Sequence, residues 1–573
     1  MSRQQSEGHR MSIETDRPWV SQYADGVPAT IALPTGSLVD MFDDSVRAYK
    51  SNVALDFFGS TTTYAELGML VARAAEGLRR AGVGPGDRVA LVLPNCPQHV
   101  IAFYAVLRLG AIVVEHNPLY TDREMRHQFE DHGAKVAIVW DKVGDRIHSM
   151  PADVAFDTVV AVDITRAMPL SKRLALRLPV PKARDARKAL TADSKRSMPW
   201  EKLINHRPVR RSVPRPTVDD LAVIQYTSGT TGTPKGAKLT HFNLHANALQ
   251  GRAWVPGMVA GKEVIYAVLP MFHAYGLTLC LTFAMNSGAR LVLLPKFDVD
   301  LVLDAAKSHP PTFLPAVPPI YERLALGAQK RKVDLTGIRF AISGAMNLPV
   351  STVELWEKAT GGYLVEGYGL TETSPVALGN PIGPSRRPGT VGVPFPSTDI
   401  RVVDPEDTSI DRTPGEEGEL LIRGPQVFQG YWQKPDETDA VLLEGGWFRT
   451  GDICTQDADG FVTIVDRIKE LIITGGFNVA PSEVEDALRQ HPGVADVAVV
   501  GMPSGGGGED VVAAVVLSSR ADFDEKEFRD WCRGQLTAYK VPKRIVVIDE
   551  LPKSLIGKVL RRAVREQLLA GKG

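Results

Sequence analysis

The chain has 573 residues, and its 66 lysine and arginine residues nearly balance its 67 aspartate and glutamate residues. This balance excludes a generally basic protein, so we expect no nucleic-acid partner. The length suggests roughly three to four domain-sized units. Four scattered cysteines without metal-ligand spacing favour a reduced, cytoplasmic protein. Residues 1–25 begin with polar residues and no apolar signal segment, and we expect a flexible tail there.

Short apolar strands alternate with helical patterns over residues 53–140. A helix is predicted from Thr63 through Leu78, and strands are predicted at 89–93, 111–114 and 135–139. This alternation is typical of parallel sheets that helices cover on both faces. The sequence therefore predicts an α/β fold for this region.

Residues 166–215 differ in composition from the rest of the chain. They hold 15 basic and only 3 acidic residues, together with six prolines. One interpretation is a solvated, partly disordered insertion; nucleic-acid binding is another, which nothing else in the chain supports. A third is a patch attracted to anionic lipid headgroups, because apolar residues are interspersed with the cations. Those apolar residues are Leu170, Leu174, Leu176, Leu178 and Trp200.

A loop rich in hydroxyl groups and glycine follows the apolar run at 221–224. Residues 226–236 read Tyr-Thr-Ser-Gly-Thr-Thr-Gly-Thr-Pro-Lys-Gly. Glycines let backbone N–H groups face an anion, while the hydroxyls and the lysine add donors, so the loop is suited to hold a polyphosphate. It does not have P-loop spacing, because the required second glycine falls on Pro234. A flexible surface loop is the alternative.

A second alternating region covers about 220–380, with strands expected at 264–269, 290–294 and 339–342. Residues 264–285 carry no formal charge over 22 residues, a length that could span a bilayer. Pro270, His273 and Gly276 interrupt this run. We therefore expect a buried strand, a turn at 269–273 and a buried helix instead of a membrane span.

The sequence pattern changes again after residue 388. Short strands with frequent Gly and Pro indicate a small β-barrel or sandwich over 388–465. A compact α+β pattern follows, with a helix opening at Ser482 and strands at 494–500 and 511–517. We expect a large domain at 26–466, which includes the insertion at 166–215, and a small domain at 467–573.

Four more motifs follow the phosphate loop in order: residues 363–373 (Tyr-Leu-Val-Glu-Gly-Tyr-Gly-Leu-Thr-Glu-Thr), 450–452 (Thr-Gly-Asp), 466–470 (Asp-Arg-Ile-Lys-Glu) and 557–558 (Gly-Lys). Together the five motifs resemble the adenylate-forming superfamily of acyl-CoA synthetases, adenylation domains and luciferases, and within it the bacterial long- or medium-chain fatty acid–CoA ligases. The resemblance implies two α/β subdomains plus a β-barrel, followed by a mobile α+β lid. It also implies two steps: a carboxylate and Mg-ATP give acyl-AMP and pyrophosphate, and coenzyme A then displaces AMP.

The resemblance assigns roles that suit the chemistry of the side chains. Both reactants of the first step are anions, so cations and N–H donors must gather where negative charge develops. An ionised carboxylate can accept two ribose hydroxyls, and Mg²⁺ needs few protein ligands beside substrate phosphates. The residues expected to bind the phosphates are Thr227, Ser228, Gly229, Thr230, Thr231, Gly232 and Lys235, and those expected around adenine are Gly344, Ala345, Met346, Glu366, Gly367, Tyr368, Gly369 and Thr371. Asp452 and Arg467 are expected to bind the ribose, and Glu372 and Thr227 the metal. Lys558, Lys235 and His273 are the expected catalytic residues.

The family pattern also implies a moving lid. Lys469 matches the hinge position, and rotation there would replace Lys558 with a coenzyme A path lined by Gly475, Gly476 and Phe477. Two departures weaken finer inferences. Leu277 stands where some members have an aromatic gate, and Ser504 precedes four glycines in a turn where relatives usually have aspartate and fewer glycines.

The expected partners are a fatty acid, ATP and coenzyme A, with Mg²⁺ as cofactor. The main alternatives are another carboxylate–CoA ligase or a ligase that delivers its acyl group to a separate carrier protein. A non-catalytic nucleotide-binding scaffold is disfavoured because Lys235, Glu372, Asp452 and Lys558 are all present. The resemblance leaves a homodimer open. The expected location is the cytoplasm, with peripheral contact at the inner face of the membrane through 166–215.

Overall fold

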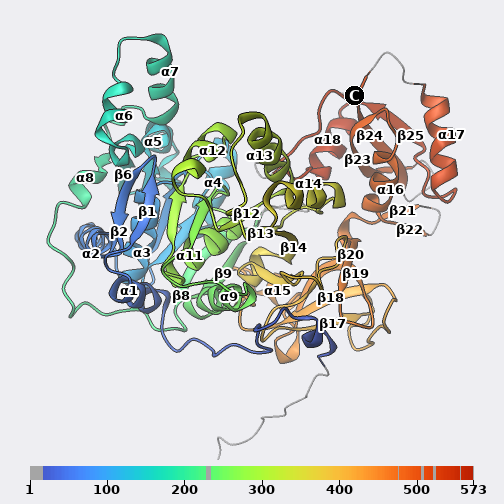
Figure 1. Ribbon diagram of the computed structural model, residues 1–573, viewed down its shortest axis with the longest axis horizontal. Helices are drawn as coiled ribbons and strands as arrows, with labels where there is room; N and C mark the ends of the chain where they lie inside the picture. Colours follow the sequence, from blue (N-terminus) through green and yellow to red (C-terminus); the bar gives the residue numbers. More distant parts are fainter. Residues whose placement is uncertain are drawn as a thin grey trace, which may run out of the picture.

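The structure is a computed structural model that describes residues 17–227, 234–474, 477–504, 509–519, 524–554 and 557–571. Two large sheets and one small sheet form the main body, and a smaller carboxyl-terminal body lies beside it (Figure 1). The predicted mixed α/β fold with a large first domain and a small second domain is confirmed.

The first large sheet has seven strands in the order β7-β6-β5-β3-β4-β8-β9. Neighbouring strands are parallel except β8 and β9, which are antiparallel. The three strands predicted before residue 140 are confirmed as members. The strands are β3 (Arg88–Val92), β4 (Ile112–Glu115), β5 (Val136–Trp140), β6 (Thr158–Val162), β7 (Met198–Pro199), β8 (Leu221–Tyr226) and β9 (Gly236–Thr240).

Three of the five helices of this region begin at a capping box. The Thr63 side chain accepts from the Glu66 N–H, and the Glu66 side chain accepts from the Thr63 N–H, so a capping box starts α2 at Tyr64. The predicted helix is confirmed. The helices are α1 (Leu38–Ala48), α2 (Tyr64–Arg80), α3 (Pro97–Arg108), α4 (Asp122–His132) and α5 (Asp141–His148).

The second large sheet has nine strands in the order β16-β15-β14-β13-β12-β10-β11-β1-β2. Leu55 of β1 pairs in parallel with Leu291 of β11, so a strand that precedes the first sheet in sequence belongs to the second. The alternation of strands and helices along the sequence does not indicate which sheet a strand joins. The strands are β1 (Val53–Phe57), β2 (Ser60–Thr63), β10 (Val264–Ala267), β11 (Arg290–Leu293), β12 (Phe313–Ala316), β13 (Phe340–Ser343), β14 (Tyr363–Gly369), β15 (Val376–Gly379) and β16 (Val393–Pro394); the helices are α9 (His241–Trp254), α12 (Val299–Ser308), α13 (Pro318–Arg331) and α14 (Val350–Thr360).

The uncharged run at 264–285 lies in the core, as predicted. Strand β10 leads through the turn at 269–273 into α10 (Ala274–Gly276), a π-helical segment (Leu277–Thr282) and α11 (Phe283–Asn286). All residues of these three helical segments are buried. In the described part of the chain, no helix has both the length and the apolar character needed to cross a bilayer.

The region 388–465 forms an open antiparallel sheet in the order β17-β18-β19-β20. The expected short strands are present, but the closed β-barrel is not found among the described residues. Four strands do not need to close on themselves here, because apolar residues of this sheet, such as Ile400 and Leu420, join the same core as the large sheets. The elements are β17 (Asp399–Val403), β18 (Gly418–Arg423), β19 (Phe448–Gln456), β20 (Val462–Arg467) and α15 (Pro435–Asp439).

Two expectations about irregular segments need correction. Residues 17–25 do not form a loose tail, since Trp19 is buried and the Tyr23 hydroxyl donates to the Pro394 carbonyl at 2.6 Å; residues 1–16 lie outside the described residues. The segment 166–215 is described throughout and folds into α6 (Leu170–Ala175), α7 (Pro181–Leu190), β7 and α8 (Trp200–Leu203). Trp200 is buried in the main core, so it does not belong to an exposed patch.

The carboxyl-terminal body has its own hydrophobic clusters, which include Val484, Val499 and Val564. Strands β23 and β24 are antiparallel and β25 is parallel to β24. The predicted helix after 482 and both predicted strands are confirmed. The elements are β21 (Ile472–Thr474), β22 (Phe477–Val479), α16 (Pro481–Arg489), β23 (Val494–Pro503), β24 (Glu509–Leu517), α17 (Glu525–Gln535), β25 (Arg544–Val547) and α18 (Arg561–Leu569).

Candidate functional site

The two ends of the predicted phosphate loop meet at the carboxyl end of β8. The Thr227 N–H donates to the Lys235 carbonyl at 2.9 Å, and the Lys235 N–H donates to the Thr227 hydroxyl at 3.3 Å. Tyr226 anchors the strand end, because its hydroxyl donates to Asp131 at 2.7 Å. The described ends of the loop, Thr227 and Lys235, are therefore held together. Ser228, Gly229, Thr230, Thr231 and Gly232 lie outside the described residues.

A buried tyrosine connects Lys235 to Glu372. The Lys235 Nζ lies 4.5 Å from the centroid of the Tyr431 ring, and the Tyr431 hydroxyl donates to Glu372 Oε1 at 2.7 Å. Burial, and then the Glu372 carboxylate, raise the pKa of Tyr431, so it keeps the proton that it donates. Glu372 is itself only 8% exposed. Sequence reasoning missed Tyr431, whose Gly-Tyr-Trp surroundings carry no phosphate or metal signal.

The predicted adenine site lies where β13 and β14 end side by side. Ser343 pairs in parallel with Glu366, which brings residues 344–346 beside residues 366–369. Ala345 has a φ of +66°, a left-handed conformation unusual for alanine. Gly369 is required as glycine, because a Cβ there would lie 1.8 Å from the Pro375 carbonyl oxygen. The chain thus holds these two segments in one close-packed arrangement.

Glu366 lies beneath this site as a buried carboxyl group. It is 7% exposed and accepts the Leu348 N–H at 3.3 Å. Burial raises its pKa to about 8, so the group is mostly protonated at neutral pH. Thr371 follows β14 in a short 3₁₀ turn that ends at Thr373 and contains Glu372. The structure therefore places Glu366 and Thr371 at opposite ends of the Gly-Tyr-Gly segment.

Tyr368, Asp452 and Arg467 form a contiguous group. The Tyr368 hydroxyl donates to Asp452 Oδ2, and Arg467 Nε lies 2.9 Å from Asp452 Oδ1. Strand pairing sets Asp452 of β19 opposite Arg467 of β20. Asp452 is 2% exposed, so one hydroxyl donor and one guanidinium charge lie on either oxygen of an almost buried carboxylate. The sequence named all three residues, but it did not predict that Tyr368 bonds to Asp452.

The carboxyl-terminal body brings Lys558 into the same place. A Cβ on Gly557 would lie 3.7 Å from the Met346 sulfur, so the segment before Lys558 lies against the 344–346 loop. Burial lowers the pKa of Lys558 to about 8; the Arg467 charge adds to this effect, while nearby carboxylates, Asp452 among them, oppose it. Burial also lowers the pKa of His273 to about 4, and the charge of Lys558 contributes. A lysine 285 positions along the chain from His273 therefore shares its electrostatic environment.

Side chains that the sequence did not single out position the turn that carries His273. Asn95 donates to the Leu269 carbonyl at 2.7 Å and accepts the Met271 N–H at 2.8 Å. Gln225 donates to the Phe272 carbonyl at 2.9 Å. Asn95 and Gln225 come from the first sheet region, and the turn comes from the second. These bonds fix the two halves of the main body at the site, and only the tertiary structure reveals them.

A second network holds the small domain beside the site. Arg561, three residues after Lys558, lies 2.8 Å from Glu485 and 3.5 Å from Asp466, and also pairs with Glu470. Asp466 in turn accepts the Ser482 N–H at 2.8 Å. Asp466 precedes the predicted hinge and the other groups follow it. Sequence reasoning missed Arg561, Glu485 and Ser482 as members of the site.

The remaining predicted positions are less informative. Lys469 lies in a short 3₁₀ turn (Ile468–Glu470) between β20 and β21. Gly475 and Gly476 lie outside the described residues, and Phe477 begins β22. Leu277 is fully buried. The glycines at 505–508 also lie outside the described residues.

Comparison with known proteins gives a consistent result. The AMP-binding enzyme model matches residues 42–432, and the AMP-binding enzyme C-terminal domain matches 483–558. The chain is 38% identical to a long-chain-fatty-acid--CoA ligase of Bacillus subtilis, over 97% of this chain and 99% of that protein. It is also 38% identical to the protein of that name from Escherichia coli O157:H7, over 96% and 98%.

Solved structures agree with these sequence matches. The structure of ATP-bound MatB from Rhodopseudomonas palustris is 31% identical to this chain, with a TM-score of 0.77. The match covers 92% of this chain and 98% of that chain. The predicted resemblance to adenylate-forming enzymes is confirmed. Because a family model covers most of the chain and the relatives match over nearly its full length, the chain belongs to the AMP-binding enzyme family.

Proposed function

We propose that the chain is a fatty acid–CoA ligase that activates a medium- to long-chain fatty acid with ATP and transfers it to coenzyme A. The observation that carries the proposal is the position of Lys558, which lies against the 344–346 loop in the electrostatic environment of Asp452, Arg467 and His273. The curated relatives named above are long-chain-fatty-acid--CoA ligases.

In the first step a carboxylate oxygen bonds to the α-phosphorus of ATP and the bond to pyrophosphate breaks. Lys235 and the loop after Thr227 would hold the β- and γ-phosphates. Residues 344–346 and Tyr368 would enclose adenine, and Asp452 with Arg467 would bind the ribose. Because Tyr368 and Arg467 already orient the Asp452 carboxylate, the ribose hydroxyls meet an acceptor that is fixed in advance.

The residues around Glu372 fit a magnesium site. Among the described residues no group of three or more His, Cys, Asp or Glu side chains forms a metal cage, and Mg²⁺ is ordinarily held by one or two carboxylates together with substrate phosphates. Glu372, with Thr227 beside the phosphate loop, provides such a partial set. When bound, Mg²⁺ would neutralise charge on the phosphates.

Lys558 would contact the α-phosphate and the attacking carboxylate. Its side chain is partly buried near charged groups, so it would meet developing negative charge without a large rearrangement of water. His273 would form the neighbouring wall as a neutral imidazole, since its pKa of about 4 lies well below neutrality. The buried apolar helix that follows His273 would line the acyl chain.

For the second step we propose rotation of the small domain about Lys469. In that arrangement Lys558 leaves, and Gly475, Gly476 and Phe477 line the path of coenzyme A. The thiol sulfur then bonds to the acyl carbonyl carbon, AMP leaves, and the thiol proton passes to solvent. The domain division at 466–467 belongs to this proposal.

A panel of carboxylic acids tests the function. With ATP, Mg²⁺ and coenzyme A, medium- and long-chain fatty acids should release AMP and pyrophosphate and yield acyl-CoA detectable by mass spectrometry. Short and aromatic acids serve as comparison substrates. Acyl transfer only to an acyl carrier protein would favour the carrier-protein alternative, and AMP release with aromatic acids alone would favour a different carboxylate–CoA ligase.

Replacing Tyr431 with phenylalanine should raise the Mg²⁺ concentration needed for half-maximal adenylation about tenfold. The substitution removes the hydroxyl that orients Glu372, and loss of such an orienting bond typically weakens metal affinity 10–100-fold. Activity measured across a Mg²⁺ titration gives the shift. Tyr363→Phe, in β14, is the control. An unchanged Mg²⁺ requirement in Tyr431→Phe would mean that Glu372 does not serve the metal.

We further propose that the protein works in the cytoplasm and contacts the membrane surface through part of 166–215. A homodimer stays a prediction, to be checked by the mass of the protein in solution.

A further inference from the structure

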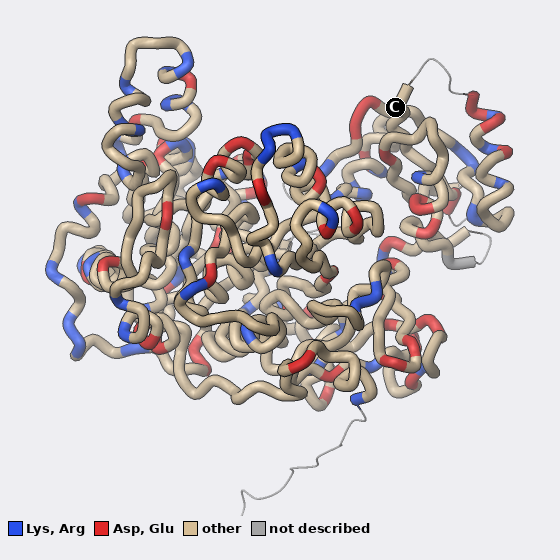
Figure 2. The backbone as a smooth tube through the Cα atoms, in the orientation of Figure 1, with Lys and Arg blue, Asp and Glu red and all other residues tan. Residues whose placement is uncertain are grey.

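A basic helical hairpin, residues 169–191, projects from the main body. It consists of α6, α7 and the residues that join them (Figure 1). Seven of its residues are lysine or arginine, and only Asp185 is acidic. Figure 2 shows these cations along both arms of the projection. The hairpin therefore carries seven of the basic residues of the earlier segment against one acidic residue, and Trp200 is not part of it.

Large apolar side chains are also exposed on the hairpin. Leu170 is 65% exposed, Leu174 55%, Leu178 56% and Val180 46%. These are four of the 14 large hydrophobic side chains exposed in the described part of the chain. Single exposed leucines are normal on a soluble protein, whereas four within 11 residues mark a contact surface.

The cations of the hairpin are available to an outside partner. Arg173, Arg177 and Arg187 form no ion pair with any other residue that the structure describes. Arg166, just before the hairpin, differs because it lies 3.6 Å from Asp163 and 3.4 Å from Glu201. The hairpin thus carries positive charge that the protein itself does not neutralise.

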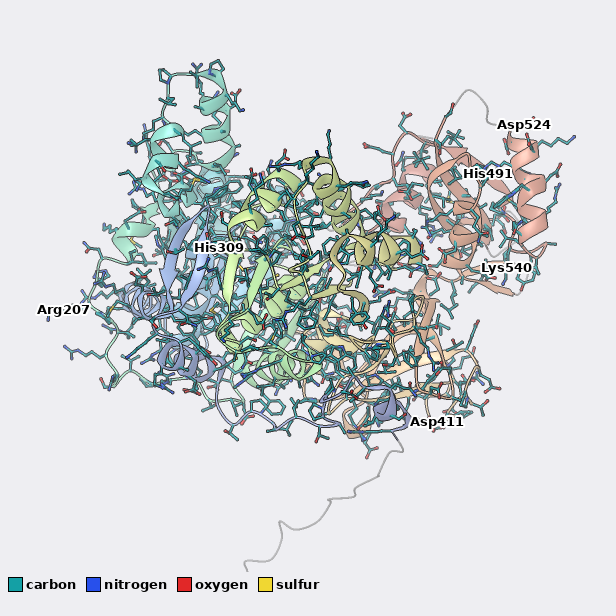
Figure 3. The ribbon with its side chains drawn as sticks, viewed as in Figure 1. Arg207, His309, Asp411, His491, Asp524 and Lys540 are labelled. Carbon is teal, nitrogen blue, oxygen red and sulfur yellow. The ribbon has the colours of Figure 1, made fainter. Side chains whose placement is uncertain are left out.

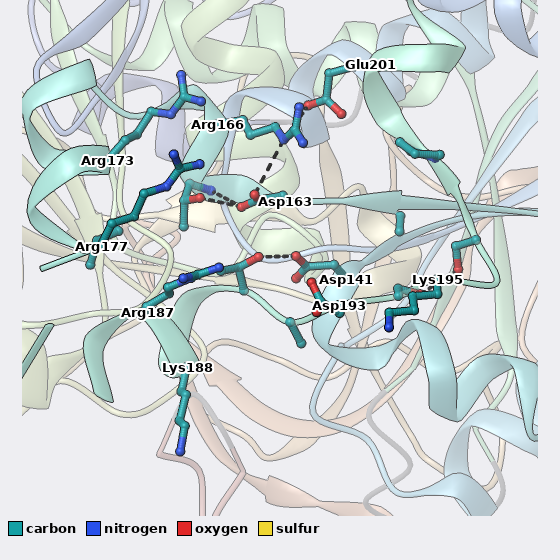
Figure 4. A pocket seen from close by; sticks show the side chains of 18 of the residues that line it. Asp141, Asp163, Arg166, Arg173, Arg177, Arg187, Lys188, Asp193, Lys195 and Glu201 are labelled. Carbon is teal, nitrogen blue, oxygen red and sulfur yellow. Dashed lines mark hydrogen bonds and ion pairs between the residues drawn. The ribbon is translucent and has the colours of Figure 1, made fainter. Parts of the chain in front are cut away.

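A cavity of about 830 Å³ opens between the hairpin and the ends of β5 and β6 (Figure 4). Arg173, Arg177 and Arg187 line it from the hairpin side. Four carboxylates also line the cavity: Asp163 and Glu201 lie near Arg166, the Thr191 hydroxyl donates to Asp141, and Asp193 is the fourth. Guanidinium groups bind phosphate with two parallel hydrogen bonds, so the hairpin wall suits a phosphate headgroup.

We infer that the hairpin docks on an anionic phospholipid bilayer, with its arginines on headgroup phosphates and its leucines at the boundary of the acyl region. The inference deepens the proposed function, because it names the partner that would supply a membrane-derived fatty acid. Each Lys or Arg near an anionic surface strengthens binding roughly fivefold, and the exposed leucines add apolar contact.

Docking through the hairpin would leave the small domain free to rotate, because the two lie far apart. The hairpin and the carboxyl-terminal body lie at opposite ends of the long axis (Figure 1). Figure 3 places Arg207, which follows the hairpin in the chain, at one end of the molecule and His491 and Lys540 of the small domain at the other. Docking through the hairpin therefore does not oppose rotation of the lid.

Flotation with vesicles, without ATP or fatty acid, tests the inference. The full chain should bind phosphatidylcholine vesicles that contain phosphatidylglycerol and bind pure phosphatidylcholine much more weakly, and salt should reduce binding. The variant Arg173→Glu/Arg177→Glu/Arg187→Glu should bind at least about tenfold more weakly. The variant Leu170→Ser/Leu174→Ser/Leu178→Ser should also lose binding, but with its salt dependence retained.

The matched control is Leu326→Ser/Lys330→Glu on α13, where Leu326 is 55% exposed like Leu174. It should bind vesicles like the unchanged chain, and unchanged thermal unfolding shows that each variant is folded. Equal binding to neutral and anionic vesicles, equal loss in the control, or binding to RNA but not to vesicles would overturn the inference. Because flotation needs no turnover, its failure is distinguishable from failure of the ligase assay.

Discussion

Replacing Lys558 with alanine is expected to slow acyl-adenylate formation about 10²–10³-fold, the usual effect of losing one preorganised transition-state donor. The same variant should form thioester from presynthesised acyl-adenylate at nearly the normal rate, because the proposed rotation removes Lys558 before that step. Pyrophosphate release and acyl-CoA formation, measured as separate half-reactions, give the two rates.

The structure supplies the reason for this asymmetry. Lys558 is partly buried near Arg467 and Asp452 and contributes to the lowered pKa of His273, so in this arrangement it lies in the proposed adenylation site. Lys553→Ala is the control, because Lys553 lies in the same segment but pairs with Asp496 on the surface at 2.6 Å. Equal slowing of both half-reactions by Lys558→Ala would show that the two-position mechanism is wrong.

The pH dependence provides a second readout for the same residue. Lys558 acts as a cation, and its pKa is lowered to about 8. The protonated fraction is therefore nearly complete well below pH 8 and falls as the pH rises through that value. Adenylation should decline over this window, and Lys558→Arg, which stays charged, should lose the decline. His273 is neutral throughout, because its pKa is about 4.

The sequence named many of the residues that the structure brings together, because their signals are local. The loop at 226–236, the Gly-Tyr-Gly segment around Tyr368 and the Gly-Lys pair at 557–558 each concentrate unusual residues in a short stretch. Alternation of strands and helices likewise predicted the parallel sheets. Asp452 was recognisable because its short motif stands in a fixed order with the others.

Contacts between distant segments could not be predicted in this way. Tyr431 reaches Glu372 across 59 residues and Asn95 reaches Met271 across 176, with no local pattern to mark either. The open sheet replaced the expected barrel for a similar reason, since its apolar face packs on a core that other segments build. Trp200 was wrongly assigned to the exposed patch, because the composition of a segment does not indicate whether an aromatic residue among cations faces solvent or the core.

Replacing Arg561 with methionine is expected to destabilise the small domain by about 3–5 kcal/mol, the typical effect of removing one partner from a buried ion-pair network. Arg561 faces Glu485, Asp466 and Glu470, and the first two are only 4% exposed. Without the guanidinium these carboxylates remain close together in a poorly hydrated space. Chemical denaturation, monitored through the exchange of amide hydrogens in α16 and α18, measures the loss of stability.

The same substitution should also slow adenylation more than thioester formation. Arg561 and the Ser482 N–H both contact Asp466 across the proposed hinge, so they hold Lys558 in the adenylation site. Arg562→Met is the matched control, because Arg562 forms an exposed pair with Glu566 at 2.9 Å, a type of pair worth little. If Arg561→Met unfolds the domain, Ser482→Ala, which removes only the hydroxyl that accepts from Arg561 at 2.7 Å, gives a milder comparison. Equal slowing of the two half-reactions by a folded Arg561 variant would mean that the network stabilises the domain without selecting its position.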